Sequence, residues 1–172
     1  MRAVIISIHP KWCEKIASGE KTVELRKTRP KTNLPFKCYV YCTKDGYAGI
    51  FSGKPFLSHN RHVCNGKVIG EFVCDSILSH CEMANADIAE ITSCVRREDI
   101  RKYSDGKEVF GWHISDLKIY DKPKELREFK PCHRCEYVEG CRTYVEHRPD
   151  GDCRKPILRP PQSWCYVEEL EG

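Results

Sequence analysis

The sequence predicts an α+β fold in which strands outnumber short helices. Several segments alternate apolar with polar residues or are rich in β-branched and aromatic side chains, which is typical of strands. Apolar residues recur at helical spacing in only a few short segments. With 172 residues, the chain is long enough for one domain, or for one domain with a small appendage, and for a sizeable core. The pattern alone leaves open whether the strands form an open sheet or a partly closed barrel.

The first elements are a strand over residues 3–8 and a helix that begins at Pro10. The strand is an uninterrupted apolar run, and proline suits the first turn of a helix because its missing N–H costs nothing there. Gly19 is expected to end this helix. The apolar face of the helix comprises Trp12, Cys13, Ile16 and Ala17.

Residues 21–27 predict a half-buried strand. Val23 and Leu25 alternate with Thr22, Glu24 and Arg26, and successive side chains of a strand point to opposite faces. A carboxylate and a guanidinium are therefore expected on the same face.

Further strands are expected over residues 36–43, 67–77, 109–115, 117–120 and 163–168. Gly70 is a candidate bulge within the second of these. Helical periodicity predicts two consecutive helices, over 87–94 and 96–103, and a short helix over 123–129 that begins with proline. The segment 44–66 has four glycines and no periodicity, so a long excursion is expected there.

The octapeptide GEKTVELR, residues 19–26, and the later GWHI, residues 111–114, resemble the ASCH (activating signal cointegrator homology) domain of the PUA-like superfamily. The resemblance implies an RNA-associated, partly closed β-barrel flanked by short helices. It favours the barrel over an open sheet. The domain would cover residues 1–130, followed by a cysteine-rich metal loop over 131–155 and a closing strand of the barrel within 156–172.

The resemblance also implies a ligand cleft between the barrel and the N-terminal helix. The residues expected to line it are Ser7, Trp12, Lys21, Glu24, Arg26 and Trp112. Lys21 and Arg26 suit a phosphate, while Glu24 can accept hydrogen bonds from a base edge. The alternatives are a solvated ion pair on the strand and a purely structural core position for Trp112. His9 and His113 are secondary candidates, and His113 should point away from the face of Trp112.

A catalytic alternative uses Lys21 and Glu24 as a hydrolase pair. Glu24 would act as general base while Lys21 stabilises developing negative charge. Some bacterial members of the family are amidohydrolases that act on acetylated cytidine with a lysine, a threonine and a glutamate, and others have been linked to RNA cleavage. Lys21 matches the lysine, but Glu24 stands where the threonine would fall. That departure weighs against the deacetylase activity.

The charge distribution favours a nucleic-acid partner, RNA or a nucleotide, more than the net charge of +4 does. Basic segments attract phosphates by Coulomb steering and counterion release, although many are only solvated faces. The segment 11–37 has three acidic residues and eight basic ones, namely Lys11, Lys15, Lys21, Arg26, Lys27, Arg29, Lys31 and Lys37.

Five of the twelve cysteines predict a structural zinc site. Cys132 and Cys135 form a CxxC, and Cys141 follows shortly after. Four thiolates in a tetrahedron are typical of structural zinc. Cys153 is preferred as the fourth ligand, because Cys165 lies in an expected strand that would constrain its geometry. The alternative is a set of ordinary reduced thiols, and the other seven cysteines are expected to be small buried hydrophobes.

The cysteine count and the N-terminus together predict a cytoplasmic protein. The apolar run at residues 3–8 is shorter than a signal-peptide core and far shorter than a membrane span. Thiols in a reducing compartment then favour metal ligation over disulfides. No membrane partner is expected, while the zinc loop offers a surface for a protein partner.

Overall fold

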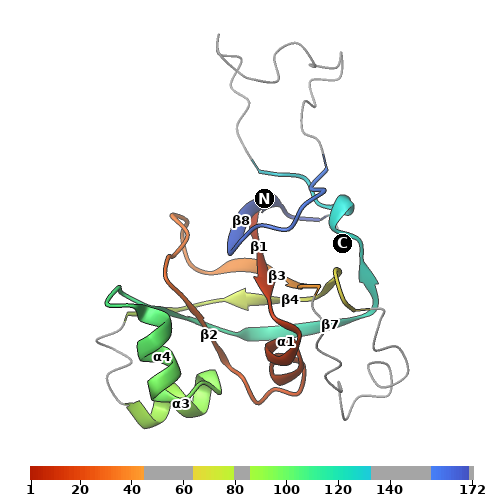
Figure 1. Cartoon of the computed structure of the whole chain (residues 1–172). Coiled ribbons are helices and arrows are strands. Elements are labelled where there is room, and N and C mark those ends of the chain that lie inside the picture. The colour runs from red at the N-terminus through yellow and green to blue at the C-terminus, as the bar shows by residue number, and fades with distance from the viewer. Residues whose placement is uncertain (45–63, 80–85, 133–155, 171–172) are drawn as a thin grey trace, which may run out of the picture.

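The computed structural model describes residues 1–44, 64–79, 86–132 and 156–170. These residues form one mixed sheet and one antiparallel sheet with a few short helices (Figure 1). The larger sheet has the order β7 (Ser115–Lys124), β4 (Val68–Cys74), β3 (Phe36–Cys42), β1 (Arg2–Ile8), β8 (Trp164–Glu168). Strands β1 and β3 are parallel, and the other neighbours are antiparallel. The predicted last strand is confirmed, since β8 pairs with β1.

The smaller sheet has the order β2 (Val23–Arg26), β6 (Phe110–His113), β5 (Ile77–Leu78). At two places the chain passes from one sheet to the other within one or two residues, at residues 75–76 after β4 and at Ile114 after β6. The strands expected over 67–77 and 109–115 are therefore each divided between two sheets. Because each sheet keeps two edge strands, the described residues form no closed barrel. The architecture is α+β, with one mixed and one antiparallel sheet.

The helices among the described residues are α1 (Pro10–Ala17), α3 (Ala86–Ser93) and α4 (Arg97–Ser104), with a short 3₁₀ turn, η1 (Leu126–Glu128). The predicted pair of consecutive helices is confirmed. Of the short helix expected over 123–129, only the turn η1 is found, and its expected start at Pro123 is wrong because β7 continues through Pro123 to Lys124. β7 is an edge strand, where a residue without an N–H does not break a ladder.

The core lies on both faces of the larger sheet. Val4 and Ile6 face a cluster that includes Cys13 and Ile16 of α1, while Ile5 faces a second cluster on the opposite side. All of these side chains are at most 1% exposed. A strand that is covered on both faces has no polar side, which explains the continuous apolar run at residues 3–8.

Gly70 lies at an irregular register of β4, as expected. The pairing of β4 shifts beside this glycine against both β3 and β7. A Cβ at this position would lie 2.5 Å from the carbonyl oxygen of Lys118. Glycine is therefore required because the backbone of β7 approaches too closely for any side chain.

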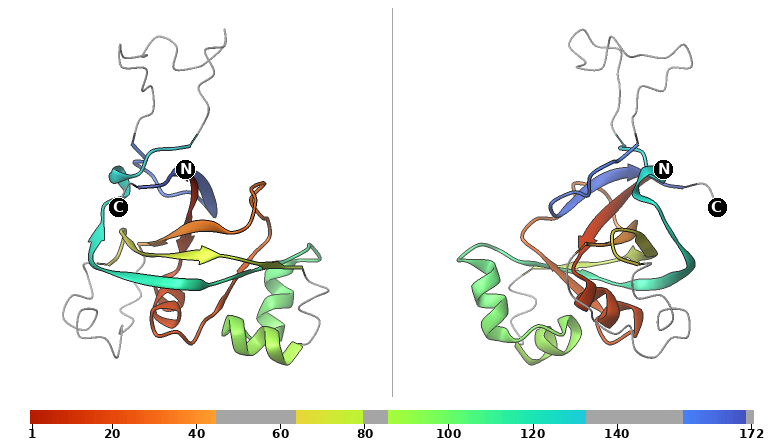
Figure 2. Two further views of the ribbon diagram at one scale, coloured as in Figure 1. Left: turned by 180° about the vertical axis from the view of Figure 1, so that it is seen from behind. Right: turned by 45° about the vertical axis from the view of Figure 1, so that its right-hand side comes forward.

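Strand β2 runs between two helical parts of the molecule, with α1 on one side and the pair α3 and α4 on the other (Figures 1 and 2). The third cluster of apolar side chains joins Val23 and Leu25 of β2 to Val95, Ile100 and Val109. None of the helices in the described part of the chain is long and apolar enough to cross a membrane.

Candidate functional site

The segment from α1 to β2 is fixed by a tight turn and by distant backbone partners. Gly19 has φ +80, the left-handed conformation that ends helices. The N–H of Lys21 then donates to the carbonyl of Lys15 at 2.9 Å, and the N–H of Thr22 donates to the carbonyl of Thr92 at 2.8 Å. The start of β2 is therefore tied to both α1 and α3.

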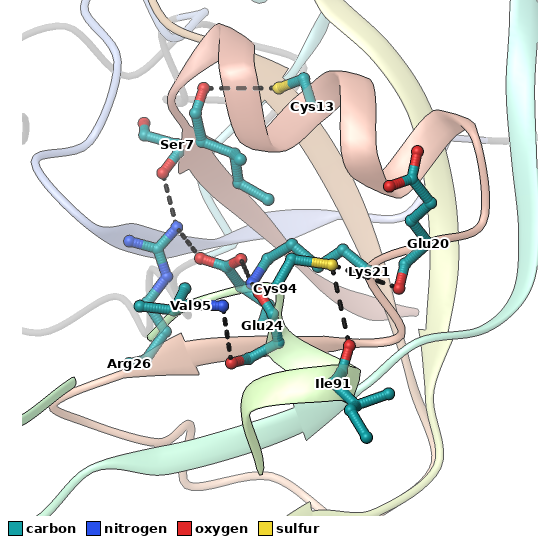
Figure 3. A network of polar contacts seen from close by, with 11 residues as sticks. Ser7, Cys13, Glu20, Lys21, Glu24, Arg26, Ile91, Cys94 and Val95 are labelled. Atoms are coloured by element: carbon teal, nitrogen blue, oxygen red, sulfur yellow. Dashed lines mark hydrogen bonds and ion pairs between the residues drawn. The ribbon is translucent and has the colours of Figure 1, made fainter. Parts of the chain in front are cut away.

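Glu24 and Arg26, predicted to share one face, form a buried ion cluster together with Lys21 (Figure 3). The Nζ of Lys21 lies 3.3 Å from Oε2 of Glu24, and Nη2 of Arg26 lies 3.1 Å from Oε1 of Glu24. The three side chains are only 2%, 8% and 11% exposed for Lys21, Glu24 and Arg26. The solvated surface ion pair considered above is therefore not what the structure contains.

Backbone carbonyls complete the cluster and hold the cations in place. Lys21 donates to the carbonyl of Ser93 at 2.7 Å, and Arg26 donates to the carbonyl of Ser7 at 2.6 Å. The hydroxyl of Ser7 is occupied elsewhere, since it donates to the carbonyl of Pro161 at 2.7 Å. Ser7 therefore contributes its backbone to the cluster, and its side chain ties β1 to the segment before β8.

Two polar atoms of the cluster have no hydrogen-bond partner among the described residues: Oε2 of Glu24 and Nε of Arg26. The 3.3 Å contact from Lys21 to Oε2 is an ion pair by distance but does not have hydrogen-bond geometry. A buried polar atom without a hydrogen-bond partner is costly, so such atoms commonly mark ligand sites. The cluster therefore contains one buried acceptor and one buried donor whose hydrogen-bonding capacity is not used within the described residues.

A cavity of about 390 Å³ lies over this cluster. Its volume is within the range of small-molecule pockets. It is lined by Ser7, Ile8, His9, Trp12, Lys21, Glu24, Leu25, Arg26, Thr43, Val95, Asp99 and Tyr103. The structure therefore brings together five of the six residues expected in the cleft, and the secondary candidate His9 lies with them.

Trp112 is the exception. It is 0% exposed and packs in the main core, with ring centroids 5.8 Å from Phe36 and 5.8 Å from Trp164. It is absent from the cavity lining. The expectation that Trp112 lines the cleft is therefore wrong, and the alternative of a structural core position describes it. His113 points elsewhere and places Nδ1 2.6 Å from Oδ1 of Asp75.

Helix α4 contributes residues that the sequence did not single out. Tyr103 and Asp99 line the cavity from this helix, and Val95 lines it from the preceding turn. Burial raises the pKa of Tyr103, while hydrogen bonds from the backbone of Lys27 and the side chain of Arg26 act in the opposite direction. Helical periodicity located α4, but only its packing against β2 shows that these side chains face the ion cluster.

Most of the predicted zinc ligands, Cys135, Cys141 and Cys153, lie outside the described residues. Cys132 is described, and its N–H donates to the carbonyl of Tyr166 in β8 at 3.1 Å. Cys165 packs against the second core cluster, and burial raises its pKa. Within the described ranges, no three metal-binding side chains cluster together.

The other cysteines follow the expectation for small buried hydrophobes where the structure describes them, with one exception. Five are buried: Cys13, Cys38, Cys42, Cys64 and Cys74. Cys94 is the exception because it is partly exposed at the end of α3, with φ 55. Cys81 lies outside the described residues.

Comparison with known proteins supports the fold. The ASCH domain model matches residues 6–146. The crystal structure of ASCH from Zymomonas mobilis is similar, with a TM-score of 0.54, 18% identity and coverage of 97% of this chain and 88% of that one. A serine-to-alanine mutant of that protein has a TM-score of 0.53, 18% identity and coverage of 97% and 89%. A search of curated proteins finds no match.

Proposed function

The chain belongs to the ASCH domain family, and from that premise we propose that it binds RNA or a modified nucleotide in the cavity between α1, β2 and α4. ASCH domains are generally linked to RNA binding. The observation that carries the proposal is the buried Lys21–Glu24–Arg26 cluster beneath a cavity of about 390 Å³. A cluster maintained only for stability would not need an acceptor and a donor without hydrogen-bond partners beside a cavity.

The chemistry of the cluster suits an unpaired base. Proteins recognise single-stranded RNA by stacking splayed bases on aromatic or apolar side chains and by hydrogen-bonding their Watson–Crick edges. Glu24 accepts from an amino or imino group, and Arg26 donates to a ring nitrogen or carbonyl. Trp12 and Tyr103 supply aromatic surface in the lining.

The proposal is tested by measuring the affinity of the full chain for single-stranded RNA, double-stranded RNA and DNA across a range of salt concentrations. We expect single-stranded RNA to bind best. The double variant Lys21→Ala with Arg26→Ala should weaken binding at least about tenfold, because charge-assisted hydrogen bonds contribute roughly 1.5–3 kcal/mol each. A matched variant, Lys107→Ala with Lys122→Ala, removes the same charge outside the cavity lining.

The outcome of this experiment must be separated from unfolding. The thermal midpoint of each variant is measured first, and Lys21→Met with Arg26→Gln keeps more of the side-chain volume if the alanine pair does not fold. Affinity that is unchanged in a folded double variant removes the proposed site.

The second candidate function is hydrolysis of RNA or of an acylated nucleoside. The observation that favours it is the 3.3 Å separation of Lys21 Nζ and Glu24 Oε2 beside the cavity. For an acylated amine, Glu24 would take a proton from water as the oxygen attacks the acyl carbon, and Lys21 would stabilise the oxyanion. The C–N bond then breaks, and the amine leaves with the proton from Glu24. Turnover that survives Glu24→Gln would exclude this role.

The cysteine-rich loop over 131–155 stays part of the proposal as a structural zinc site. Four ligands would leave no open position for water, so the metal would stabilise the loop and take no part in the reaction. Cys132 would tie the site to β8 through its hydrogen bond to Tyr166. We also propose that the two sheets are related to those of the PUA-like fold. The same proposal includes a cytoplasmic location and a protein partner that binds this loop.

A further inference from the structure

Two lysines at the cavity lie over the aromatic rings that line it. The Nζ of Lys11 is 4.3 Å from the ring centroid of Trp12, and the Nζ of Lys27 is 5.1 Å from that of Tyr103. Both rings belong to the cavity lining. A cation over an aromatic face is held by the ring quadrupole without being neutralised.

The rings beneath the two lysines line the cavity from different elements. Lys11 and Trp12 come from α1, whereas Tyr103 comes from α4 and Lys27 follows the end of β2. These helices lie on opposite sides of β2 in the views of Figures 1 and 2. Lys27 is also fixed to its wall, because its backbone hydrogen-bonds Tyr103.

The charge of both lysines is available to a ligand. Both side chains are exposed, and neither has a carboxylate within ion-pair distance among the described residues. Asp99 lines the same cavity, but its Oδ2 lies 3.2 Å from Nε of Arg96. The acid nearest this wall is therefore already engaged by another cation.

We propose that Lys11 and Lys27 bind the phosphates on either side of the base held in the cavity, so that the ligand is a nucleotide within a single strand of RNA. This inference rests on the proposed function and specifies its ligand class. A free nucleoside has no phosphate to meet these lysines, and a mononucleotide has a phosphate on one side only. An internal nucleotide of a strand occupies both walls.

The experiment compares three probes with the full chain: a nucleoside mixture, the matching 5′-mononucleotides, and a single-stranded RNA pentamer pool. Affinity is measured from 50 to 200 mM salt for the native chain and for Lys11→Gln with Lys27→Gln. Each phosphate contact on a single strand contributes about 0.7 to the slope of log affinity against log salt, so the slope should fall by about 1.4. Over that range the native chain should lose about sevenfold more affinity for the pentamer than the variant does.

The controls separate this inference from the proposed function. Nucleoside binding should be equal in the native chain and the double variant, because neither lysine touches the ion cluster. Lys107→Gln with Lys122→Gln removes equal charge elsewhere and should keep the native slope. Lys11→Arg with Lys27→Arg should restore the affinity for the pentamer.

The outcomes separate the proposed role of Lys11 and Lys27 from the proposed function. A native salt slope in the folded double variant overturns the role of these lysines, even if nucleosides bind in the cavity. Equal affinity of the native chain for nucleoside and pentamer overturns it as well. If the native chain binds none of the probes, the proposed function itself fails, and this inference fails with it.

Discussion

The Nζ of Lys21 lies 3.3 Å from Oε2 of Glu24 within an almost fully buried cluster, and Arg26 contacts the other oxygen of the same carboxylate at 3.1 Å. Two cations thus share one anion away from water. Removing the anion leaves both cations without a countercharge, whereas removing one cation leaves a complete pair. The two kinds of substitution should therefore differ strongly in stability.

Glu24→Ala should lower the free energy of unfolding by about 3–5 kcal/mol, the cost of breaking a buried pair from one side. Lys21→Met should lower the free energy of unfolding by less, because Arg26 still pairs with Glu24 and the methionine retains most of the buried apolar stem. Urea unfolding of both variants beside the native chain measures the difference. A smaller loss in Glu24→Ala than in Lys21→Met would contradict the shared-anion arrangement.

The contact between Asp75 and His113 should make the free energy of unfolding depend on pH in the acidic range. The two residues lie 2.6 Å apart where β4 and β6 approach the crossovers between the sheets. The hydrogen bond from His113 lowers the pKa of Asp75. Because the unfolded state then binds more protons, the stabilisation is present above the unfolded pKa of about 3.9 and is lost as pH falls through the folded pKa.

Asp75→Asn is therefore expected to be less stable than the native chain at pH 7, and the two should converge towards pH 3. The side chains are 40% and 45% exposed for His113 and Asp75, so the difference should stay below about 1 kcal/mol. Denaturant unfolding from pH 3 to pH 7 checks this. If the difference in the free energy of unfolding between Asp75→Asn and the native chain is constant from pH 3 to pH 7, the contact between Asp75 and His113 does not cause that difference.

Thiol labelling of the native chain should separate its cysteines by burial. Burial raises the pKa of Cys64 to about 11 and that of Cys74 to about 12. Only the thiolate reacts, and at pH 8 it amounts to about 0.1% of Cys64 or less. Cys94, which is partly exposed, should be alkylated first among the described cysteines of residues 1–130. Mass-spectrometric mapping after brief iodoacetamide treatment tests the order, and denatured protein provides the reference in which all sites react.

Protein purified without added metal should contain about one equivalent of zinc, the content of a single four-ligand site. Cys132→Ser and Cys135→Ser should each abolish most of it. Cys94→Ser removes a thiol outside the cysteine-rich loop and should leave the metal content unchanged. Less than half an equivalent in the native chain would remove the zinc proposal.

Local elements of the fold could be predicted from the sequence because their causes are local. Pro10 and Gly19 mark the two ends of α1, and the alternation over residues 23–26 marks β2. The division of residues 67–77 into β4 and β5 could not be predicted, because both parts have strand character. They differ only in the sheet that supplies their partners.

The sequence by itself determined that Glu24 and Arg26 lie on one face, since a strand places alternate residues on one face, and the resemblance to the ASCH domain added Lys21 to the same site. Only the tertiary structure decided that the face is buried, because the groups that complete it come from far along the chain. The carbonyl of Ser93 that accepts from Lys21 is 72 positions away. The same limit explains why the sequence did not single out Tyr103 and why it wrongly placed Trp112 in the site. Periodicity orients a side chain relative to its own element, whereas packing between elements decides which residues that side chain contacts.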